Sequence, residues 1–249
     1  GRYVRPSPEA REEIHAAHDR YMAEFRKLQD SDLDAFEKQP PPFMTGGDMG
    51  AWMRRYSSLR GRINTLDAAF LTEVAQALPE DQRASVERVR WVRETQVLRS
   101  GFLAEIGNAM GGGGRVDLGD LFYTAGLNEQ ELARIDPLLR EHESRLLGVA
   151  RRSSDETERL LLDFTDRLQK MGLWGDALVQ AQQDPEKAME MYRQTADLMR
   201  EIFTAMAESS ARVAEINRRS YREIRDQISF DALVKGLPRR HMAGVPQLE

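Results

Sequence analysis

The segment from Pro185 to about Ser229 contains no internal glycine or proline, and this constrains the fold more than any other feature of the sequence. Its apolar side chains recur three and four residues apart, which is the spacing of one face of an α-helix. At about 1.5 Å per residue, a single helix over this segment would be roughly 65 Å long. The segment therefore predicts one long helix whose apolar face must be buried against other helices or a partner. That face consists of Met189, Tyr192, Met199, Ile202, Met206, Val213, Ile216 and Ile224.

Helix start and stop signals divide the rest of the chain into further helical segments. Ser7-Pro8-Glu9 is a typical start, with an N-cap serine and proline at the first helical position. Pro40–Pro42 and Gly46–Gly47 interrupt the helical pattern. Pro137 lies inside one segment, so we expect a kink or break near Asp136. The remaining predicted helices cover about 8–37, 48–77, 79–106, 117–124, 128–171 and 176–183.

The pattern predicts an all-α protein. No stretch alternates apolar and polar residues for long enough to form a sheet. The stripe from Trp52 to Val74 repeats about every 3.5 residues, which is typical of supercoiled helix pairs. We expect an elongated antiparallel helical bundle, or helical hairpins with coiled-coil-like seams. Within one continuous bundle, the expected regions are an N-terminal helical hairpin region at 1–110, a glycine-rich hinge at 111–116, a C-terminal long-helix region at 117–230 and a loose tail at 231–249.

Composition excludes several function classes. The 36 basic and 41 acidic residues nearly cancel, leaving a net charge of −5 that disfavours nucleic acid as a partner. Without cysteine, the chain has no disulfide, zinc-thiolate site or cysteine nucleophile. No run of about 18 apolar residues occurs, so we expect no transmembrane segment. Neither a His-Glu-x-x-His nor a Gly-x-Ser-x-Gly motif is present, and we predict a non-enzymatic protein without a cofactor.

A weak metal site is the first candidate site. His15 and His18 lie one turn apart on a predicted helix, with Asp19 beside them. Two imidazoles and one carboxylate could bind zinc or copper, and these three residues form the candidate set. The alternative is that His15 is exposed while His18, like His142, is a hydrogen-bonded interior group on an apolar seam.

A methionine-rich loop is the second candidate. Thioethers near the Pro/Gly interruption could bind Cu(I), form an adaptable surface for apolar segments, or pack the loop over the helix ends. We predict a protein-binding surface here, around residues 40–53, together with the faces of the long helices. Its residues would be Phe43, Met44, Met49, Trp52 and Met53.

Two helix openings carry a family resemblance. They read Leu78-Pro79-Glu80-Asp81-Gln82 and Leu127-Asn128-Glu129-Gln130-Glu131. Both resemble the LTxxQ motif of the Spy/CpxP group of extracytoplasmic helical proteins, although Pro79 and Asn128 replace its threonine and Glu131 replaces its closing glutamine in the second copy. That group includes ATP-independent chaperones and metal-stress sensors. The resemblance implies a periplasmic or secreted protein with a curved helical dimer and an apolar concave face.

These observations favour a binding function. We expect a chaperone-like or scaffold protein that contacts a protein partner or client through helix surfaces in an extracytoplasmic compartment. A homodimer would cover part of a long apolar seam. Two alternatives stay open, a metal-stress sensor that uses the histidine site and a coiled-coil component of a larger assembly.

Overall fold

A computed structural model of the chain describes Val4 and residues 6–100 and 117–228. Every regular element in these residues is a helix, which confirms the predicted all-α fold. The predicted hinge at 111–116 and the predicted tail at 231–249 lie outside the described residues. No helix among the described residues combines the length and apolar character needed to cross a membrane. The coiled-coil character of the seams stays a prediction.

The contacts divide the chain into two compact units that do not follow the order of the sequence. Three helices contribute to both units, namely α5 (Glu80–Ser100), α8 (Glu129–Lys170) and α10 (Pro185–Arg225). Among the described residues, unit 1 comprises Val4, residues 6–90 and Glu156–Phe203, and unit 2 comprises residues 91–100, 117–155 and 204–228.

Unit 1 begins with a long helical stretch whose start is set by a local cap. The Ser7 hydroxyl accepts a hydrogen bond from the amide of Ala10 at 3.2 Å, and α1 (Pro8–Leu28) begins there. A five-residue π-helix, η1 (Gln29–Leu33), leads without interruption into α2 (Asp34–Glu37). The predicted helical segment at 8–37 is therefore confirmed, with a π-turn that the sequence did not predict.

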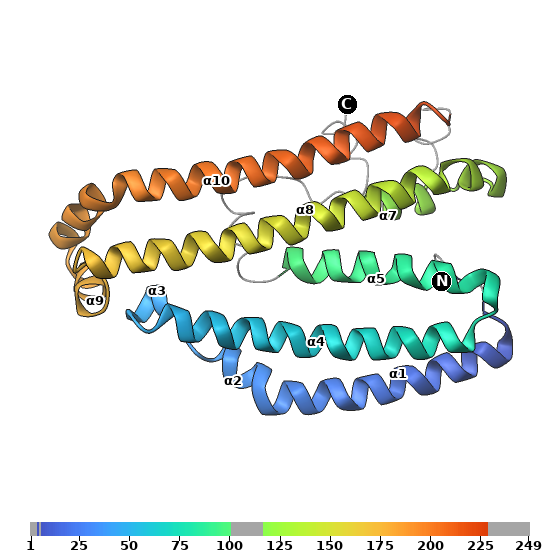
Figure 1. Cartoon of the computed structure of the whole chain (residues 1–249), viewed down its shortest axis with the longest axis horizontal. Coiled ribbons are helices and arrows are strands. Elements are labelled where there is room, and N and C mark those ends of the chain that lie inside the picture. Colours follow the sequence, from blue (N-terminus) through green and yellow to red (C-terminus); the bar gives the residue numbers. More distant parts are fainter. Residues whose placement is uncertain (1–3, 5, 101–116, 229–249) are drawn as a thin grey trace. The chain divides into compact units, whose positions relative to one another are not determined.

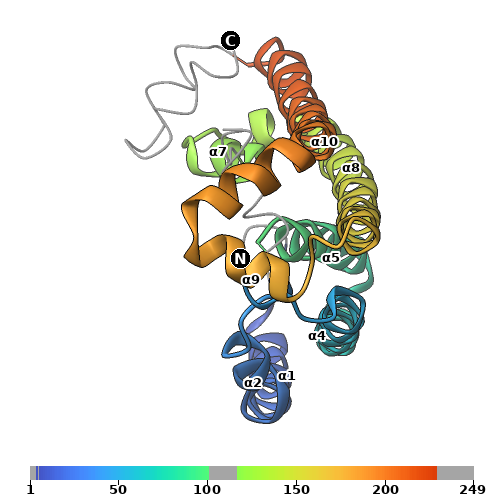
Figure 2. The same cartoon turned by 90° about the vertical axis from the view of Figure 1, so that its left-hand side faces the viewer.

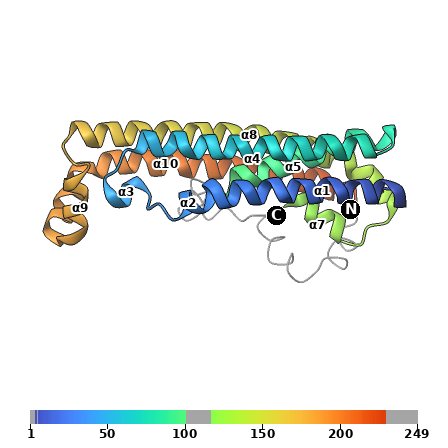
Figure 3. The same cartoon turned by 90° about the horizontal axis from the view of Figure 1, so that it is seen from below.

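The second long helix of unit 1 runs back along the first, as Figures 1 and 3 show. This helix, α4 (Met49–Ala77), begins where the Asp48 carboxylate accepts the amide of Ala51 at 2.8 Å. The Tyr21 hydroxyl donates to the carboxylate of Asp67 at 2.8 Å and joins the two helices. At one end of this hairpin, a small apolar core consists of Leu71, Val74, Leu78 and Val86.

A close backbone approach joins the loop before α4 to the turn before α9 (Asp176–Gln183). The short helix α3 (Pro42–Thr45) ends at Gly46, whose φ of +69° lies in the left-handed region. A Cβ atom at Gly46 would lie 2.5 Å from the Cα atom of Gly175. The Trp174 indole N–H donates to the carbonyl of Gly47 at 2.9 Å and so joins the same two segments of the chain.

Gly46→Ala is expected to lower the free energy of unfolding by about 2 kcal/mol, because it combines a disfavoured φ with a backbone clash. Gly172→Ala is the matched control. Gly172 has the same φ of +69°, but a Cβ added there meets no atom within 4 Å. Urea denaturation followed by circular dichroism measures both variants. Equal losses in the two variants would contradict the tight Gly46–Gly175 contact.

Unit 2 has its own apolar core around a short helix. The Asp117 carboxylate accepts the amide of Asp120 at 2.9 Å and caps α7 (Leu118–Thr124). Asn128 and Glu131 form a reciprocal capping box at the start of α8, with both bonds at 2.9 Å. The fully buried residues of the core come from α7, α8, α10 and the residue that follows α7, and they are Leu118, Leu121, Phe122, Ala125, Ile135, Leu139, Tyr221 and Ile224.

Pro137 does not break α8, and the expectation of a break near Asp136 is wrong in this respect. The helix is continuous from Glu129 to Lys170 although Pro137 cannot donate a backbone hydrogen bond. Ile135 and Leu139, on either side of Pro137, are both fully buried in the core of unit 2. Packing on both sides offsets the roughly 3 kcal/mol that an internal proline costs.

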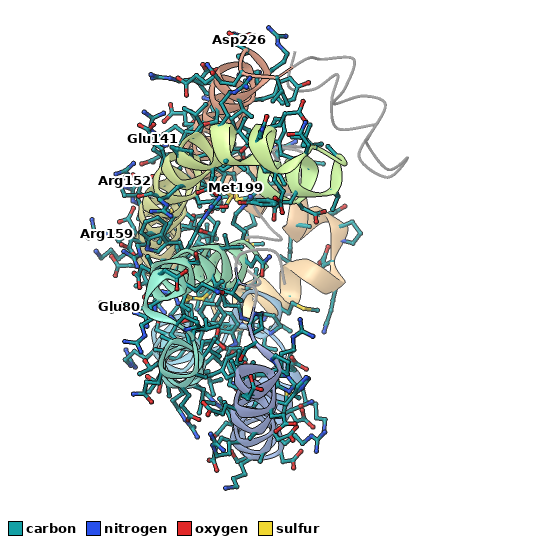
Figure 4. The ribbon with its side chains drawn as sticks, turned by 90° about the vertical axis from the view of Figure 1, so that its right-hand side faces the viewer. Glu80, Glu141, Arg152, Arg159, Met199 and Asp226 are labelled. Carbon is teal, nitrogen blue, oxygen red and sulfur yellow. The ribbon has the colours of Figure 1, made fainter. Side chains whose placement is uncertain are left out.

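Charged residues occupy the outer face of α8 within unit 2. The exposed side chains of Glu141 and Arg152 lie three turns apart on one face and point away from the core (Figure 4). Glu141 forms an ion pair with Arg145, four residues along the helix. Arg145 also lies 3.8 Å from Glu223 of α10. This face is therefore solvated and largely neutralised by its own pairs.

Candidate protein-binding surface

The structure does not build a metal site around the predicted ligands. His15, His18 and Asp19 are all exposed on α1. The described residues contain no group of three or more histidine, cysteine, aspartate or glutamate side chains that could hold a metal ion. The His18 ring instead lies 6.0 Å from the Phe70 ring, centroid to centroid, in an edge contact. The alternative expectation that His18 is an interior group is wrong, because this ring stays on the solvent side of the hairpin.

The predicted binding loop is mostly core. Met49, Trp52 and Met53 are buried, whereas Met44 is 54% exposed and the side chain of Phe43 lies outside the described part of the chain. Met49, Trp52 and Met53 stand at positions i, i+3 and i+4 of α4, so they share its inward face. These three residues therefore do not form an exposed surface, and that part of the prediction is corrected.

The aromatic residues near this loop pack against one another. The Trp52 ring stacks on the Tyr56 ring with a centroid distance of 5.7 Å and an interplanar angle of 2°. The Phe36 ring of α2 lies 5.1 Å from Trp52. Such offset aromatic contacts stabilise a core more than they serve an external partner.

Exposed apolar side chains gather instead on another part of unit 1. Among the described residues, all six exposed large hydrophobic side chains belong to this unit. Tyr192 is 62% exposed and Met189 is 55% exposed, both in the first turns of α10. Five of the six lie between Leu162 and Phe203, and the full set is Met44, Leu162, Met171, Met189, Tyr192 and Phe203.

One of these exposed residues, Tyr192, lines a hollow of about 330 Å³. Its walls come from the end of α8, from Trp174 and α9, and from the start of α10, which Figure 2 shows in orange beside α9. Met199, labelled in Figure 4, and Tyr192 line it on the α10 side. The remaining lining residues are Phe164, Leu168, Leu178, Ala188, Met191 and Thr195.

The polar groups in this hollow already have partners. The Thr195 hydroxyl donates to the carbonyl of Met191 at 2.9 Å, and the Trp174 indole N–H is bound to Gly47. A ligand in the hollow would therefore meet methyl, thioether and aromatic surface. Methionine is flexible and polarisable, so such a surface adapts to different apolar shapes.

The charges around the hollow neutralise one another. Arg167 lies 2.8 Å from Asp163 and 3.1 Å from Glu201. The hydrogen bond that Arg167 donates to Asp163 is the main cause that raises the pKa of Arg167, so this guanidinium stays charged. Lys170 lies 2.5 Å from Asp166. Because these surface charges are paired, they contribute little to the binding of a charged partner. Apolar contact therefore contributes more to binding at this surface than ionic contact does.

The sequence predicts the apolar residues of this surface but not their exposure. Met189, Tyr192 and Met199 follow the helical period, but the period alone predicts a covered face. Their exposure depends on which other helices cover them, and no local pattern predicts that.

No protein-family model, no curated protein and no solved structure matches the chain. Its function is therefore inferred from the geometry of the described residues.

Proposed function

We propose that this chain is a non-enzymatic helical binding protein, chaperone-like or scaffold, that holds apolar segments of client proteins at the hollow formed by α8, α9 and α10 in unit 1. The observation that carries the proposal is the apolar hollow lined by the exposed Tyr192, with the exposed Met189 next in sequence to Ala188 of its lining. Exposed clusters of apolar side chains commonly mark interaction sites. An extracytoplasmic location is part of the same proposal, and it comes from the resemblance to the Spy/CpxP group.

The size of the hollow favours weak and reversible binding. A volume of about 330 Å³ accommodates one or two large apolar side chains of a client. Burial of each such side chain contributes about 1.5–3 kcal/mol. The loss of translational and rotational freedom on association offsets about 4–15 kcal/mol, so a few contacts of this kind cannot hold a client permanently. Brief contact with unfolded segments is the mode of action that fits these magnitudes.

The double variant Met189→Glu/Tyr192→Glu is expected to lose most of the ability to suppress client aggregation, because one charge would stand in the wall of the hollow at Tyr192 and the other next to Ala188 of its lining. The measurement is light scattering of reduced α-lactalbumin with increasing amounts of the protein. Met44→Glu is the matched control, since Met44 is 54% exposed in the same unit and does not line the hollow. The double variant acting like the wild type would contradict the proposal, as would a wild type that does not suppress aggregation at severalfold excess.

The homodimer and the structural component are alternatives in which the same surface is permanently covered. Sedimentation velocity measures the oligomeric state of the wild type and of the double variant, and so distinguishes these two alternatives from client binding. A stable dimer that the two glutamates dissociate would assign the surface to self-association.

A further inference from the structure

Unit 2 contains a polar cavity that the proposed function does not use. Its volume is about 260 Å³, and it lies between the end of α5, the cap of α7 and the middle of α8. Val92 and Leu146 supply apolar walls, whereas Arg99, Asp117 and Glu143 bring charges of both signs. Drug-sized ligands occupy about 300–1,000 Å³, so this cavity fits a smaller molecule.

Two buried polar atoms beside the cavity have no hydrogen-bond partner among the described residues. They are Nδ1 of His142 and Oγ1 of Thr95, and both residues line the cavity. His142 is only 2% exposed. A buried polar atom without a partner costs about 1–3 kcal/mol, so native proteins rarely keep one without a reason. Two of them at one cavity can both be satisfied by a polar ligand in it.

The state of His142 narrows the choice of ligand. Burial is the main cause that lowers the pKa of His142 to about 4; the charge of Asp117 acts to raise this pKa, and the charge of Arg99 lowers it further. The imidazole is therefore neutral at pH 7 and offers one donor and one acceptor. The charged groups at the cavity are then one cation, Arg99, and two anions, Asp117 and Glu143.

A metal ion does not suit this arrangement. No three metal-binding side chains of the described residues come close enough together to hold one, and that includes His142, Asp117 and Glu143. An organic ligand can reach groups that lie further apart. A ligand with both an ammonium and a carboxylate would pair with each sign of charge and would add no net charge to the cavity.

We infer that the cavity of unit 2 binds the zwitterion of a small apolar amino acid, with its carboxylate on Arg99, its ammonium on Glu143 and Asp117, and its side chain against Val92 and Leu146. The hydroxyl of Thr95 and the neutral imidazole of His142 supply the neutral hydrogen bonds. Arg99, Asp117 and Glu143 already have partners, among them the amide of Asp120 for Asp117. A guanidinium has five N–H donors and a carboxylate accepts up to about four hydrogen bonds, so each group can bind the ligand in addition. The volume also suits this class, because a cavity of about 150 Å³ is enough for benzene.

Isothermal titration of the full chain with L-valine, L-leucine and L-methionine tests this inference. We expect at least one of them to bind about tenfold more tightly than its two single-charge analogues, because each analogue lacks one charge-assisted pair. For leucine these analogues are 3-methylbutylamine and 4-methylpentanoate. Absence of binding by all three amino acids would overturn the inference. Equally tight binding of the amine or of the carboxylate alone would overturn it too, since the site would then recognise one charge only.

Two variants assign the ends of the ligand. Arg99→Gln is expected to weaken binding of the amino acid about tenfold and to leave the amine unaffected, whereas Glu143→Gln should weaken both. Arg151→Gln is the control, because it removes an exposed arginine that pairs with Glu94 in the same unit. Glu143 is buried and its variant could fail to fold, so Thr95→Val, which conserves shape, provides an independent test and is also expected to weaken the amino acid. Unchanged affinity in Arg99→Gln and Thr95→Val would overturn the assignment without affecting the proposed function in unit 1.

Discussion

Phe122→Ala is expected to lower the free energy of unfolding by about 3–5 kcal/mol, the largest effect of any single substitution considered for this protein. The Phe122 side chain is 0% exposed in the core of unit 2, and its ring stacks on that of Tyr221 with a centroid distance of 6.0 Å. The helix that carries it, α7, has only 7 residues, and isolated helices shorter than about 12–15 residues are marginal in water. Packing through Phe122 therefore holds α7 in place as well as filling the core.

Phe203→Ala is the matched control for this substitution. Phe203 is also an aromatic residue on a helix, but its side chain is 38% exposed, so its loss removes less buried surface. Thermal and urea unfolding followed at 222 nm compare the two variants with the wild type. If Phe122→Ala is no more destabilising than Phe203→Ala, the buried position of α7 is wrong.

The second large effect concerns pH. Burial lowers the pKa of His142 to about 4 in the folded protein, whereas an unfolded histidine titrates near pH 6.5. Between these values the unfolded chain binds a proton that the folded protein does not, so stability falls as the pH is lowered from about 6.5 to about 4. The loss is complete below the folded pKa and amounts to about 3 kcal/mol. Above pH 7 the neutral imidazole carries no such penalty.

The variant His142→Gln is expected to remove this part of the acid destabilisation, because glutamine does not titrate. Chemical denaturation at pH 7.5, 6, 5 and 4 measures the difference between the variant and the wild type. His18→Gln, which removes an exposed histidine of α1, is the control. A loss of stability between pH 6.5 and 4 that is the same in wild type and His142→Gln would show that this imidazole is not buried as described. Titration of the imidazole signals by NMR gives the folded pKa directly.

Helix starts were the most predictable part of this fold. The caps at Ser7, Asp48, Asp117 and Asn128 involve residues within three positions of one another, and the structure contains all four. The π-helix at Gln29–Leu33 was not predictable, because it has no capping signature of its own. Pro137 was misleading, since its local cost is outweighed by the burial of Ile135 and Leu139 against other helices.

The binding surfaces were much less predictable than the helices. Met49 and Met189 both follow an apolar period near the start of a long helix, yet one is buried and the other is exposed. His18 and His142 both occupy apolar seams, yet His18 is exposed and His142 lines a cavity. In each pair the sequence context is similar, and the neighbouring helix makes the difference.

The sequence by itself therefore determined the all-α class and most helix boundaries, because both depend on side chains within about four positions along the chain. The tertiary structure alone decided which apolar residues are covered, where the hollow beside Tyr192 opens, and which polar groups meet at the cavity of His142. Burial and cavity shape depend on which residues distant in sequence come together, as Thr95 and His142 do at one cavity, and helical periodicity does not predict this.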